Sequence, residues 1–372
     1  MPEIASPRSL PWFAHPAART WTCDPAPTRV RDFHAALPGY APTPLLELPH
    51  VADELGVARV LVKDESSRLG LPAFKALGAS WAVHRILAER TGDRAPAEPV
   101  TLVTATDGNH GRAVARTARL LGQRARVFVP EGVHPAAATA IAAEGARVVR
   151  VAGPYDEAVR RAAAEAAAPD AVLVQDTAWP GYERIPGWIV EGYSTLFAEL
   201  DAQLATAGAG PAGLVAVPVG VGSLAQAAVT HYRGRPAKGA TALLAVEPEA
   251  AACVLESLRR REPVSVATGE TTMAGLNCQT PSSIAWPCLR DGLDAAVAIT
   301  DADSARAARD LAALGVSCGP CGAASLAGVR AALTGEGAEA RRTALGLGSH
   351  SSLVLLSTEG ADANPHLPEH RS

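Results

Sequence analysis

The hexapeptide Thr106-Asp107-Gly108-Asn109-His110-Gly111 places polar and ionisable side chains between two glycines. It follows the extended run 100–103 and precedes a helical pattern from Arg112 to Leu121. A strand-to-helix junction leaves backbone N–H groups unpaired, which suits an anion or a polar ring substituent. Asp107 would repel an anion. The loop therefore indicates chemistry rather than simple anion capture.

Lys75 begins a predicted amphipathic helix over residues 74–89 and lies among Phe74, Ala76 and Leu77. Burial among small and apolar neighbours would lower the pKa of its amine and free it for Schiff-base chemistry. A solvated helix lysine is the alternative that the local sequence leaves open.

The run Gly220-Val221-Gly222-Ser223 follows an apolar strand at 214–219 and opens a helix. Glycines let the backbone approach a phosphate, and the dipole of the helix favours its negative charge. The pattern is weak on its own. Because no Gly-Lys-Ser/Thr follows it, a nucleotide P-loop is not supported.

Asp107 and Asp176 both follow predicted strands, so either could act as a base or simply cap the next turn. His110 is interpreted as a structural, hydrogen-bonding histidine in preference to a ligand or a base. The sequence has no HExxH pattern and no Cys/His cluster with zinc spacing, so no metal mechanism is expected.

Short apolar strands alternate with helices along the chain, which predicts an α/β fold with doubly wound, mainly parallel sheets. Ligands of such folds bind beyond the carboxyl ends of the strands. Four polar loops follow predicted strands and are expected to form one site: 104–111, 175–182, 220–223 and 357–360. The predicted strands are 60–63, 100–104, 125–130, 148–151, 171–175, 214–219, 243–246, 296–299 and 353–356, and the predicted helices include 112–121, 134–144 and 155–168.

The bulk composition is that of a globular protein of two domains: 372 residues, 48% hydrophobic, with a net charge of −4. That charge argues against nucleic-acid and polybasic membrane surfaces. No apolar run is long enough for a membrane span, and no signal-peptide pattern is seen, so we expect a cytoplasmic protein without a membrane partner. The Pro-rich residues 1–44, with Trp12, Phe13, Trp21 and Phe33, predict an extended arm packed on the body.

Six cysteines in a chain of this length do not predict a disulfide framework. Cys318-Gly319-Pro320-Cys321 matches the dithiol motif of thioredoxin-like redox modules. The favoured interpretation is a tight Gly-Pro loop before a helix.

The order and spacing of these motifs resemble fold type II (tryptophan synthase β-like) pyridoxal-phosphate enzymes, and among them the diaminopropionate ammonia-lyases. The resemblance extends from about residue 32 to 362. The segments that carry it are 42–45, 62–66, 73–78, 106–112, 175–179 with 181–182, 220–223, 273–276 and 357–360.

The resemblance implies two doubly wound domains with pyridoxal 5′-phosphate in the cleft between them. Residues 1–96 and 191–372 would form the large domain, with 1–44 as its N-terminal arm, and 97–190 the small one. It also implies a homodimer that acts on a small amino acid.

The resemblance also assigns the site residues. Lys75, next to Phe74, would bind the cofactor as a Schiff base, and Asn109 would contact the 3′-oxygen of its ring. Gly220, Val221, Gly222 and Ser223 would hold the phosphate, and Ser357 or Thr358 would meet the pyridine nitrogen. Thr106, Asp107, Gly108, His110 and Asp176 would face the substrate, with Asp107 and Asp176 as bases on opposite faces, so that both stereoisomers react.

The implied reaction is α,β-elimination of 2,3-diaminopropionate, or of a close β-substituted alanine, to pyruvate and ammonia. Serine/threonine dehydration and a biosynthetic β-replacement remain open, as does a non-catalytic protein with the same fold. One departure stands out. Where relatives carry an acidic residue beside glycine, this chain has Gly319-Pro320-Cys321-Gly322, so the contact of that carboxylate is lost or supplied elsewhere. Cys253 and Cys278 match cysteines of relatives, and their pairing is left open.

Overall fold

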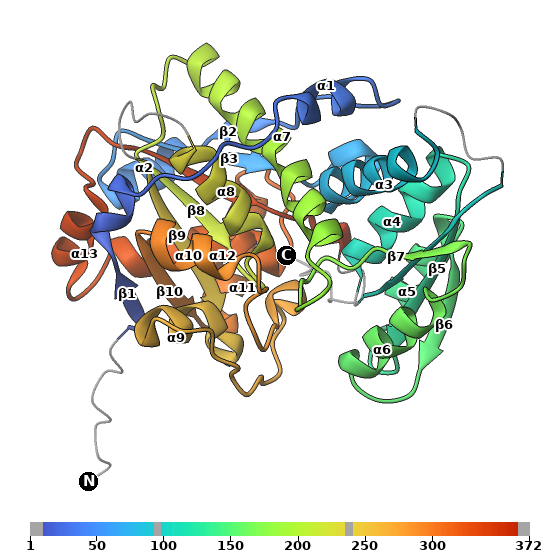
Figure 1. Ribbon diagram of the computed structural model, residues 1–372. Helices are drawn as coiled ribbons and strands as arrows, with labels where there is room; N and C mark the ends of the chain where they lie inside the picture. Colours follow the sequence, from blue (N-terminus) through green and yellow to red (C-terminus); the bar gives the residue numbers. More distant parts are fainter. Residues whose placement is uncertain (1–9, 93–97, 107, 235–240, 364–372) are drawn as a thin grey trace, which may run out of the picture.

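Two sheets lie side by side in the computed structural model, which describes residues 10–92, 98–106, 108–234 and 241–363 (Figure 1). The larger sheet has seven strands in the order β1-β10-β9-β8-β11-β3-β2, and the smaller has four in the order β6-β5-β4-β7. The strands are β1 Trp12–Ala14, β2 Leu45–Glu47, β3 Arg59–Asp64, β4 Thr101–Ala105, β5 Arg124–Pro130, β6 Arg147–Val151, β7 Ala171–Leu173, β8 Leu214–Pro218, β9 Ala242–Pro248, β10 Ala295–Ile299 and β11 Ser352–Ser357.

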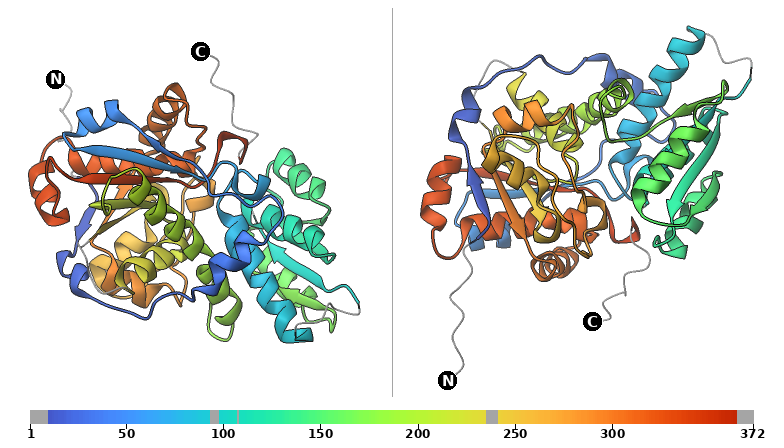
Figure 2. Two further views of the ribbon diagram at one scale, coloured as in Figure 1. Left: turned by 90° about the horizontal axis from the view of Figure 1, so that it is seen from above. Right: turned by 60° about the horizontal axis from the view of Figure 1, so that its bottom comes forward.

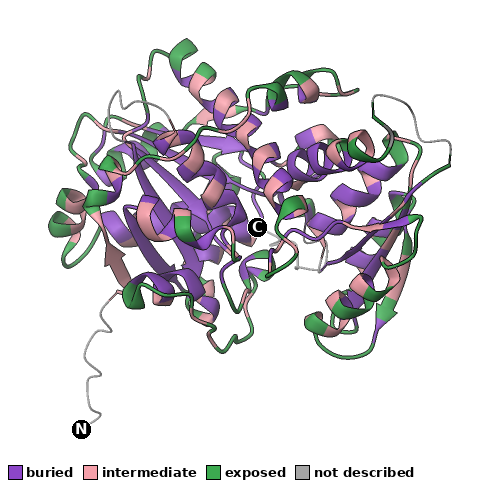
Figure 3. Ribbon diagram, in the orientation of Figure 1, coloured by how far each residue is buried: buried purple, intermediate pink, exposed green. Residues whose placement is uncertain are grey.

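The five inner strands of the large sheet and all four strands of the small sheet are parallel. This confirms the predicted doubly wound, mainly parallel α/β fold. Strands such as β8 and β10 are buried along their whole length, because helices cover both faces of a parallel sheet. Figure 3 shows the same pattern, with buried strands inside and exposed positions on the outer helices.

The helices fill the space around and between the sheets (Figure 2). On the large sheet α12 packs against β8 to β11, and α3 packs both on α7 and on α4 next to the small sheet. The helices are α1 Arg29–Ala35, α2 Pro49–Leu55, α3 Lys75–Thr91, α4 Asn109–Leu120, α5 Pro135–Ala143, α6 Tyr155–Glu165, α7 Arg184–Thr206, α8 Ser223–Arg233, α9 Cys253–Arg260, α10 Trp286–Gly292, α11 Asp301–Ala313, α12 Pro320–Leu333 and α13 Ala338–Leu345.

The largest apolar cluster is shared by both sheets. Val215 and Val217 of β8, Leu77 of α3 and Val114 of α4 are buried in it together. A second cluster covers the opposite face of the large sheet and a third the outer face of the small sheet. One continuous core therefore holds the two units against each other beside the ends of their strands.

The N-terminal arm packs on the body, as predicted, but it is not extended throughout. Trp12–Ala14 adds an antiparallel edge strand to β10, with Trp12 opposite Val297. A 3-10 turn at Pro16–Thr20 and helix α1 follow. The arm therefore contributes both a strand and a helix to the large unit.

Helix α4 begins at Asn109, three residues earlier than the sequence pattern predicts. The hydroxyl oxygen of Thr106 accepts hydrogen bonds from the backbone N–H groups of Gly108, at 3.0 Å, and Gly111, at 3.1 Å. These bonds fold the loop into the first turn of the helix. Asn109 and His110 are consequently held on a regular element rather than on a loose loop.

The predicted domain boundary at residue 190 falls inside α7, which runs without a break from Arg184 to Thr206. The division of the chain at 96 and 190 stays a prediction. Within the described ranges, no helix is both long and apolar enough to span a membrane.

Candidate active site

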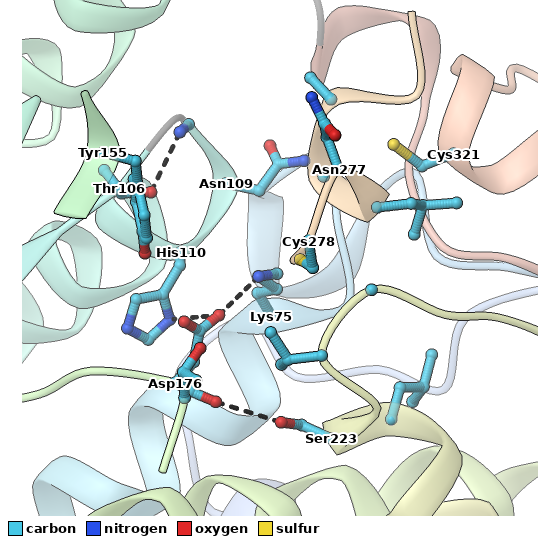
Figure 4. A pocket seen from close by; sticks show the side chains of 18 of the residues that line it. Lys75, Thr106, Asn109, His110, Tyr155, Asp176, Ser223, Asn277, Cys278 and Cys321 are labelled. Carbon is cyan, nitrogen blue, oxygen red and sulfur yellow. Dashed lines mark hydrogen bonds and ion pairs between the residues drawn. The ribbon is translucent and has the colours of Figure 1, made fainter. Parts of the chain in front are cut away.

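A cavity of about 710 Å³ opens where the carboxyl ends of strands from both sheets meet (Figure 4). All four predicted loops contribute to its wall. Two of them follow β4 and β7 of the small sheet, and two follow β8 and β11 of the large sheet, so the loops face one another across the cavity. Their lining residues are Thr106, Gly108, Asn109 and His110; Gln175, Asp176, Thr177 and Trp179; Gly220, Val221, Gly222 and Ser223; and Thr358 and Glu359.

Lys75 is held at the cavity by the end of β11. The N–H of Phe74 donates to the carbonyl of Thr358 at 3.2 Å, and Ala73 forms an antiparallel bridge with Glu359. These bonds fix the first residue of α3 against the large sheet. The side chain of Lys75 is 23% exposed and extends into the cavity, where its amine lies 2.6 Å from Oδ2 of Asp176.

The predicted lowering of the Lys75 pKa is wrong. Burial alone does act in that direction, but attraction to the Asp176 carboxylate and the hydrogen bond to it raise the pKa of Lys75 above its ordinary value. The sequence showed the apolar neighbours of the lysine but not the acid. That acid is 101 residues away in the chain.

Asp176 is ionised in this setting. Burial would raise the pKa of its carboxyl, but the charges of His110 and Lys75 and the hydrogen bond from Lys75 together hold that pKa below the ordinary range. Its backbone carbonyl accepts a hydrogen bond from the hydroxyl of Ser223 at 3.1 Å. The loop after β7 is thereby joined to the start of α8 on the other unit.

His110 is buried beside this pair, with Nδ1 3.7 Å from Oδ2 of Asp176. Its Nε2–H donates to the carbonyl of Val174 at 2.7 Å, which defines the tautomer. Burial lowers the pKa of the imidazole, and the nearby carboxylate of Asp176 acts in the opposite direction. The structural interpretation of this histidine is consistent with its bond to Val174, and its position also places it against Asp176. Asp107, the other predicted base, lies outside the described residues.

In the view of Figure 4, Asn109 lies on the other side of Lys75 from Asp176. Its Nδ2 donates to Oε2 of Glu359 at 2.7 Å. Its Oδ1 is buried and has no hydrogen-bond partner among the residues that the structure describes. A buried acceptor left in this state next to a cavity indicates a ligand that would complete its bonding.

The glycine loop 220–223 is shaped for close approach. Gly222 has φ +98° and is followed by the first turn of α8, where a Cβ on Gly222 would come within 2.5 Å of Leu289. A Cβ on Gly220 would come within 2.9 Å of the sulfur of Cys278. The loop lines the cavity at the first turn of α8, whose N–H groups have no partner within the helix, as a phosphate site requires.

Of the two predicted partners for a pyridine nitrogen, Thr358 lines the cavity. Ser357 is fully buried behind it and donates to the sulfur of Cys318 at 3.1 Å. Phe74, the predicted neighbour of Lys75, also lines the cavity and packs at a tilt on Tyr193, with ring centroids 4.8 Å apart.

The sequence prediction missed other residues of this wall. Gln175 accepts from the N–H of Ala105 at 3.0 Å and so ties the loop after β7 to the end of β4. Glu359 was noted only as part of a polar loop. Both residues lie in segments that carry the resemblance, but the sequence did not show their contacts, because each contact is made with a partner far away in the chain. The missed lining residues also include Tyr155, Tyr193, Asn277 and Cys278.

The Cys318–Cys321 segment is the start of a helix, as the favoured interpretation predicts: Gly319 caps α12 and Pro320 is its first residue. Both thiols are buried. Burial raises the pKa of Cys318 to about 12 and that of Cys321 well above its ordinary value. A redox dithiol needs an exposed thiol of low pKa, so the geometry disfavours the redox alternative. None of the six cysteines, Cys253 and Cys278 included, forms a disulfide.

Comparison with known proteins decides the family. Residues 36–347 match the family described as pyridoxal-phosphate dependent enzyme. The chain belongs to this family. Pyridoxal phosphate is accordingly its cofactor, as the sequence motifs predicted.

Within the pyridoxal-phosphate dependent enzymes, the chain is similar to diaminopropionate ammonia-lyases. It is 38% identical to that of Salmonella typhimurium strain LT2 over 300 residues, which cover 76% of this chain and 74% of the relative. It is 37% identical to that of Escherichia coli K12 over 273 residues, 70% of this chain and 68% of the relative.

Solved structures agree. The diaminopropionate ammonia lyase from Escherichia coli, in complex with an aminoacrylate-PLP azomethine reaction intermediate, matches with a TM-score of 0.86 at 31% identity over 97% of both chains. The same protein in complex with D-serine matches with a TM-score of 0.87 over 97% of both chains. These likenesses confirm the predicted fold type II architecture.

The cavity fits this cofactor. It presents a lysine amine for the aldehyde, a glycine cradle with free N–H groups for the phosphate, and a hydroxyl at Thr358. The buried Oδ1 of Asn109 adds a polar atom that still lacks a partner in the described structure. The chemistry of this donor set is that of pyridoxal phosphate, and the cavity has the volume for it with a small amino acid.

Proposed function

We propose that this chain eliminates ammonia from 2,3-diaminopropionate, or from a close β-substituted alanine, and gives pyruvate. The observation that carries the proposal is the contact of 2.6 Å between the amine of Lys75 and the carboxylate of Asp176 inside the cavity. It sets a group able to bind the aldehyde of the cofactor beside a group able to take a proton. The similarity to diaminopropionate ammonia-lyases supports this choice of substrate.

In this proposal Lys75 binds the cofactor covalently and Phe74 lies beside it. The N–H groups of the loop Gly220, Val221, Gly222 and Ser223 bind the phosphate. Asn109 faces the 3′-oxygen of the ring, and the hydroxyl of Thr358 faces its nitrogen. When bound, the cofactor withdraws electrons from the α-carbon of the substrate and so makes the α-proton acidic.

Asp176 is then the acceptor of that proton on one face of the substrate. Its carboxyl is ionised, because its pKa is held low, and its Oδ2 points into the cavity. A carboxylate placed to take a proton contributes about 10² to 10⁴ in rate. His110, bonded through Nε2–H to Val174, packs against Asp176 and limits its movement.

The rest of the reaction needs a proton for the leaving amine. The α C–H bond breaks with its proton passing to Oδ2 of Asp176 and its electron pair forming the Cα–Cβ double bond, and the Cβ–N bond breaks with its electron pair on nitrogen. The amine of Lys75 is free at this stage, because the amine of the substrate has displaced it from the cofactor. It lies 2.6 Å from the carboxylate of Asp176 and is placed to carry a proton from that carboxylate to the leaving amine. One water is consumed in total, and diaminopropionate yields one pyruvate and two ammonia.

Two further predicted contacts stay proposals. Asp107 would take the α-proton on the opposite face, which would let the second enantiomer react. Thr106 and Gly108 would face the substrate, which is supported by the place of both on the cavity wall.

The experiment incubates the purified holoenzyme with D- and L-diaminopropionate, serine, threonine and cysteine, and measures 2-oxo acid and ammonia. We expect turnover of diaminopropionate well above that of the hydroxy amino acids. Turnover of serine or threonine without turnover of diaminopropionate would replace this proposal with the dehydratase alternative. Asp170→Asn, on an exposed surface of the small unit, is the matched control for variants of the acids in the site.

We also propose a homodimer that acts in the cytoplasm, with residues 1–96 and 191–372 in the large domain and 97–190 in the small one. The family resemblance supports these assignments. Sedimentation velocity on the holoenzyme tests the oligomeric state.

A further inference from the structure

Glu359 connects the two units across the cavity. It follows the last strand of the large sheet, is 3% exposed and lines the cavity beside Thr358. Its Oε2 accepts from Nδ2 of Asn109, on the first turn of α4, at 2.7 Å. Its Oε1 accepts from the backbone N–H of Cys321, in the first turn of α12, at 3.2 Å. Each carboxylate oxygen thus has a donor from a different element.

The position of this carboxylate depends on the absence of a side chain at residue 319. A Cβ on Gly319 would lie 2.8 Å from Oε1 of Glu359 and 2.9 Å from the carbonyl oxygen of Gly360. The N–H of Gly319 also donates to the backbone carbonyl of Glu359 at 3.0 Å. The loop 319–322 has no acid of its own, and Glu359 places a carboxylate against it.

Glu359 determines which way the amide of Asn109 points. A carboxylate can only accept, so the nitrogen of the amide must face it and the oxygen must face away. An asparagine without such a partner could adopt either orientation. Here Nδ2 keeps one hydrogen for a ligand, and the buried Oδ1 is held in a fixed direction.

We propose that Glu359 is a positioning residue for the cofactor, which acts by fixing the amide of Asn109 and by holding α4 against the start of α12. The proposal rests on the proposed function only for the contact between Asn109 and the ring of the cofactor. It needs no particular substrate.

The variant Glu359→Gln tests this proposal. Glutamine has one accepting oxygen for the two donors, Asn109 and Cys321, so its NH₂ group must face one of them. Loss of a hydrogen bond to a charged group changes an equilibrium constant by about 10- to 100-fold. We expect the dissociation constant of pyridoxal phosphate, measured by equilibrium dialysis, to rise about tenfold. The absorbance maximum of the bound cofactor, or the pH midpoint of its titration, should shift as well.

The double variant shows whether Glu359 acts through Asn109. Asn109→Ala should weaken cofactor binding, and adding Glu359→Gln should then change little. Glu339→Gln, exposed on α13, is the matched control and should alter neither binding nor spectrum. A purely structural role would lower the melting temperature without moving the spectral midpoint.

Gly319→Ala gives an independent test in which neither Glu359 nor Asn109 is substituted. Its Cβ would displace the carboxylate of Glu359. Gly132→Ala, with no atom near its Cβ, is its control. If Glu359→Gln fails to fold, Gly319→Ala decides. Unchanged cofactor affinity and spectrum, or fully additive effects with Asn109→Ala, would overturn the inference. A shifted spectrum in an enzyme that does not turn over diaminopropionate would overturn the substrate assignment and leave the role of Glu359 standing.

Discussion

Replacing Asp176 by asparagine should change the reactivity of Lys75 as well as the rate of turnover. At 2.6 Å and an effective dielectric constant of about 20, the attraction between the two charges is about 6 kcal/mol. That attraction opposes the burial of Lys75, which on its own lowers the pKa of the amine. Asparagine keeps the shape of the side chain and removes the charge. The pKa of Lys75 in Asp176→Asn should therefore fall below the wild-type value.

The assay follows the rate at which the cofactor-free protein forms its adduct with pyridoxal phosphate, as a function of pH. The neutral amine is the reactive form, so the midpoint of the profile should move to lower pH in Asp176→Asn. In the holoenzyme the same variant should lose about 10² to 10⁴ in kcat. Asp170→Asn should leave both quantities unchanged. A midpoint that stays in place or rises in Asp176→Asn would refute the assignment of this pair.

Three further predictions concern the glycine loop, the ion pair and the proposed second base. Gly222→Ala should weaken cofactor binding about tenfold or more in equilibrium dialysis, because a side chain at φ +98° costs about 1–2 kcal/mol and its Cβ meets Leu289. Gly208→Ala, at φ +64° with an open Cβ position, is the control. It should lower the melting temperature and leave the cofactor affinity unchanged. Folding lowers the pKa of Asp176, so the ionised carboxylate stabilises the cofactor-free protein above about pH 4, and this stabilisation is lost as the pH falls through the folded pKa. The melting temperatures of the wild type and of Asp176→Asn should therefore converge only in that acid range. Convergence near neutral pH would contradict the ion pair. Asp107→Asn and Asp176→Asn should each impair a different enantiomer of diaminopropionate, and equal losses on both enantiomers in chiral turnover assays would refute the two-base proposal.

The regular elements were predictable where the local sequence carries their signature. The apolar runs at 214–218 and 353–356 became buried parallel strands, and residues 155–165 became a helix. The edge strands β1 and β2 were not predicted, because each has only three residues, and β1 forms only by pairing with the distant strand β10. Helix α7 was not predicted either, since Pro186 and Gly187 lie in its first turn.

The candidate site was predictable as a set of loops but not as a set of contacts. Lys75, Asn109 and the glycine loop could be identified from their motifs and order. The electrostatic state of Lys75 could not, because it depends on Asp176 from another part of the chain. Glu359 has the same limitation. Its proposed role depends on the missing side chain at Gly319 and on the amide of Asn109, which only folding brings next to it.

The central claim is that this pyridoxal-phosphate dependent enzyme breaks a Cβ–N bond. The most direct measurement is the ratio of ammonia to pyruvate formed by the holoenzyme from diaminopropionate, with Lys75→Ala as the control. The account predicts two ammonia for each pyruvate in the wild type and no product in Lys75→Ala. Absence of pyruvate from diaminopropionate, with turnover of serine or threonine at one ammonia for each 2-oxo acid, would contradict it.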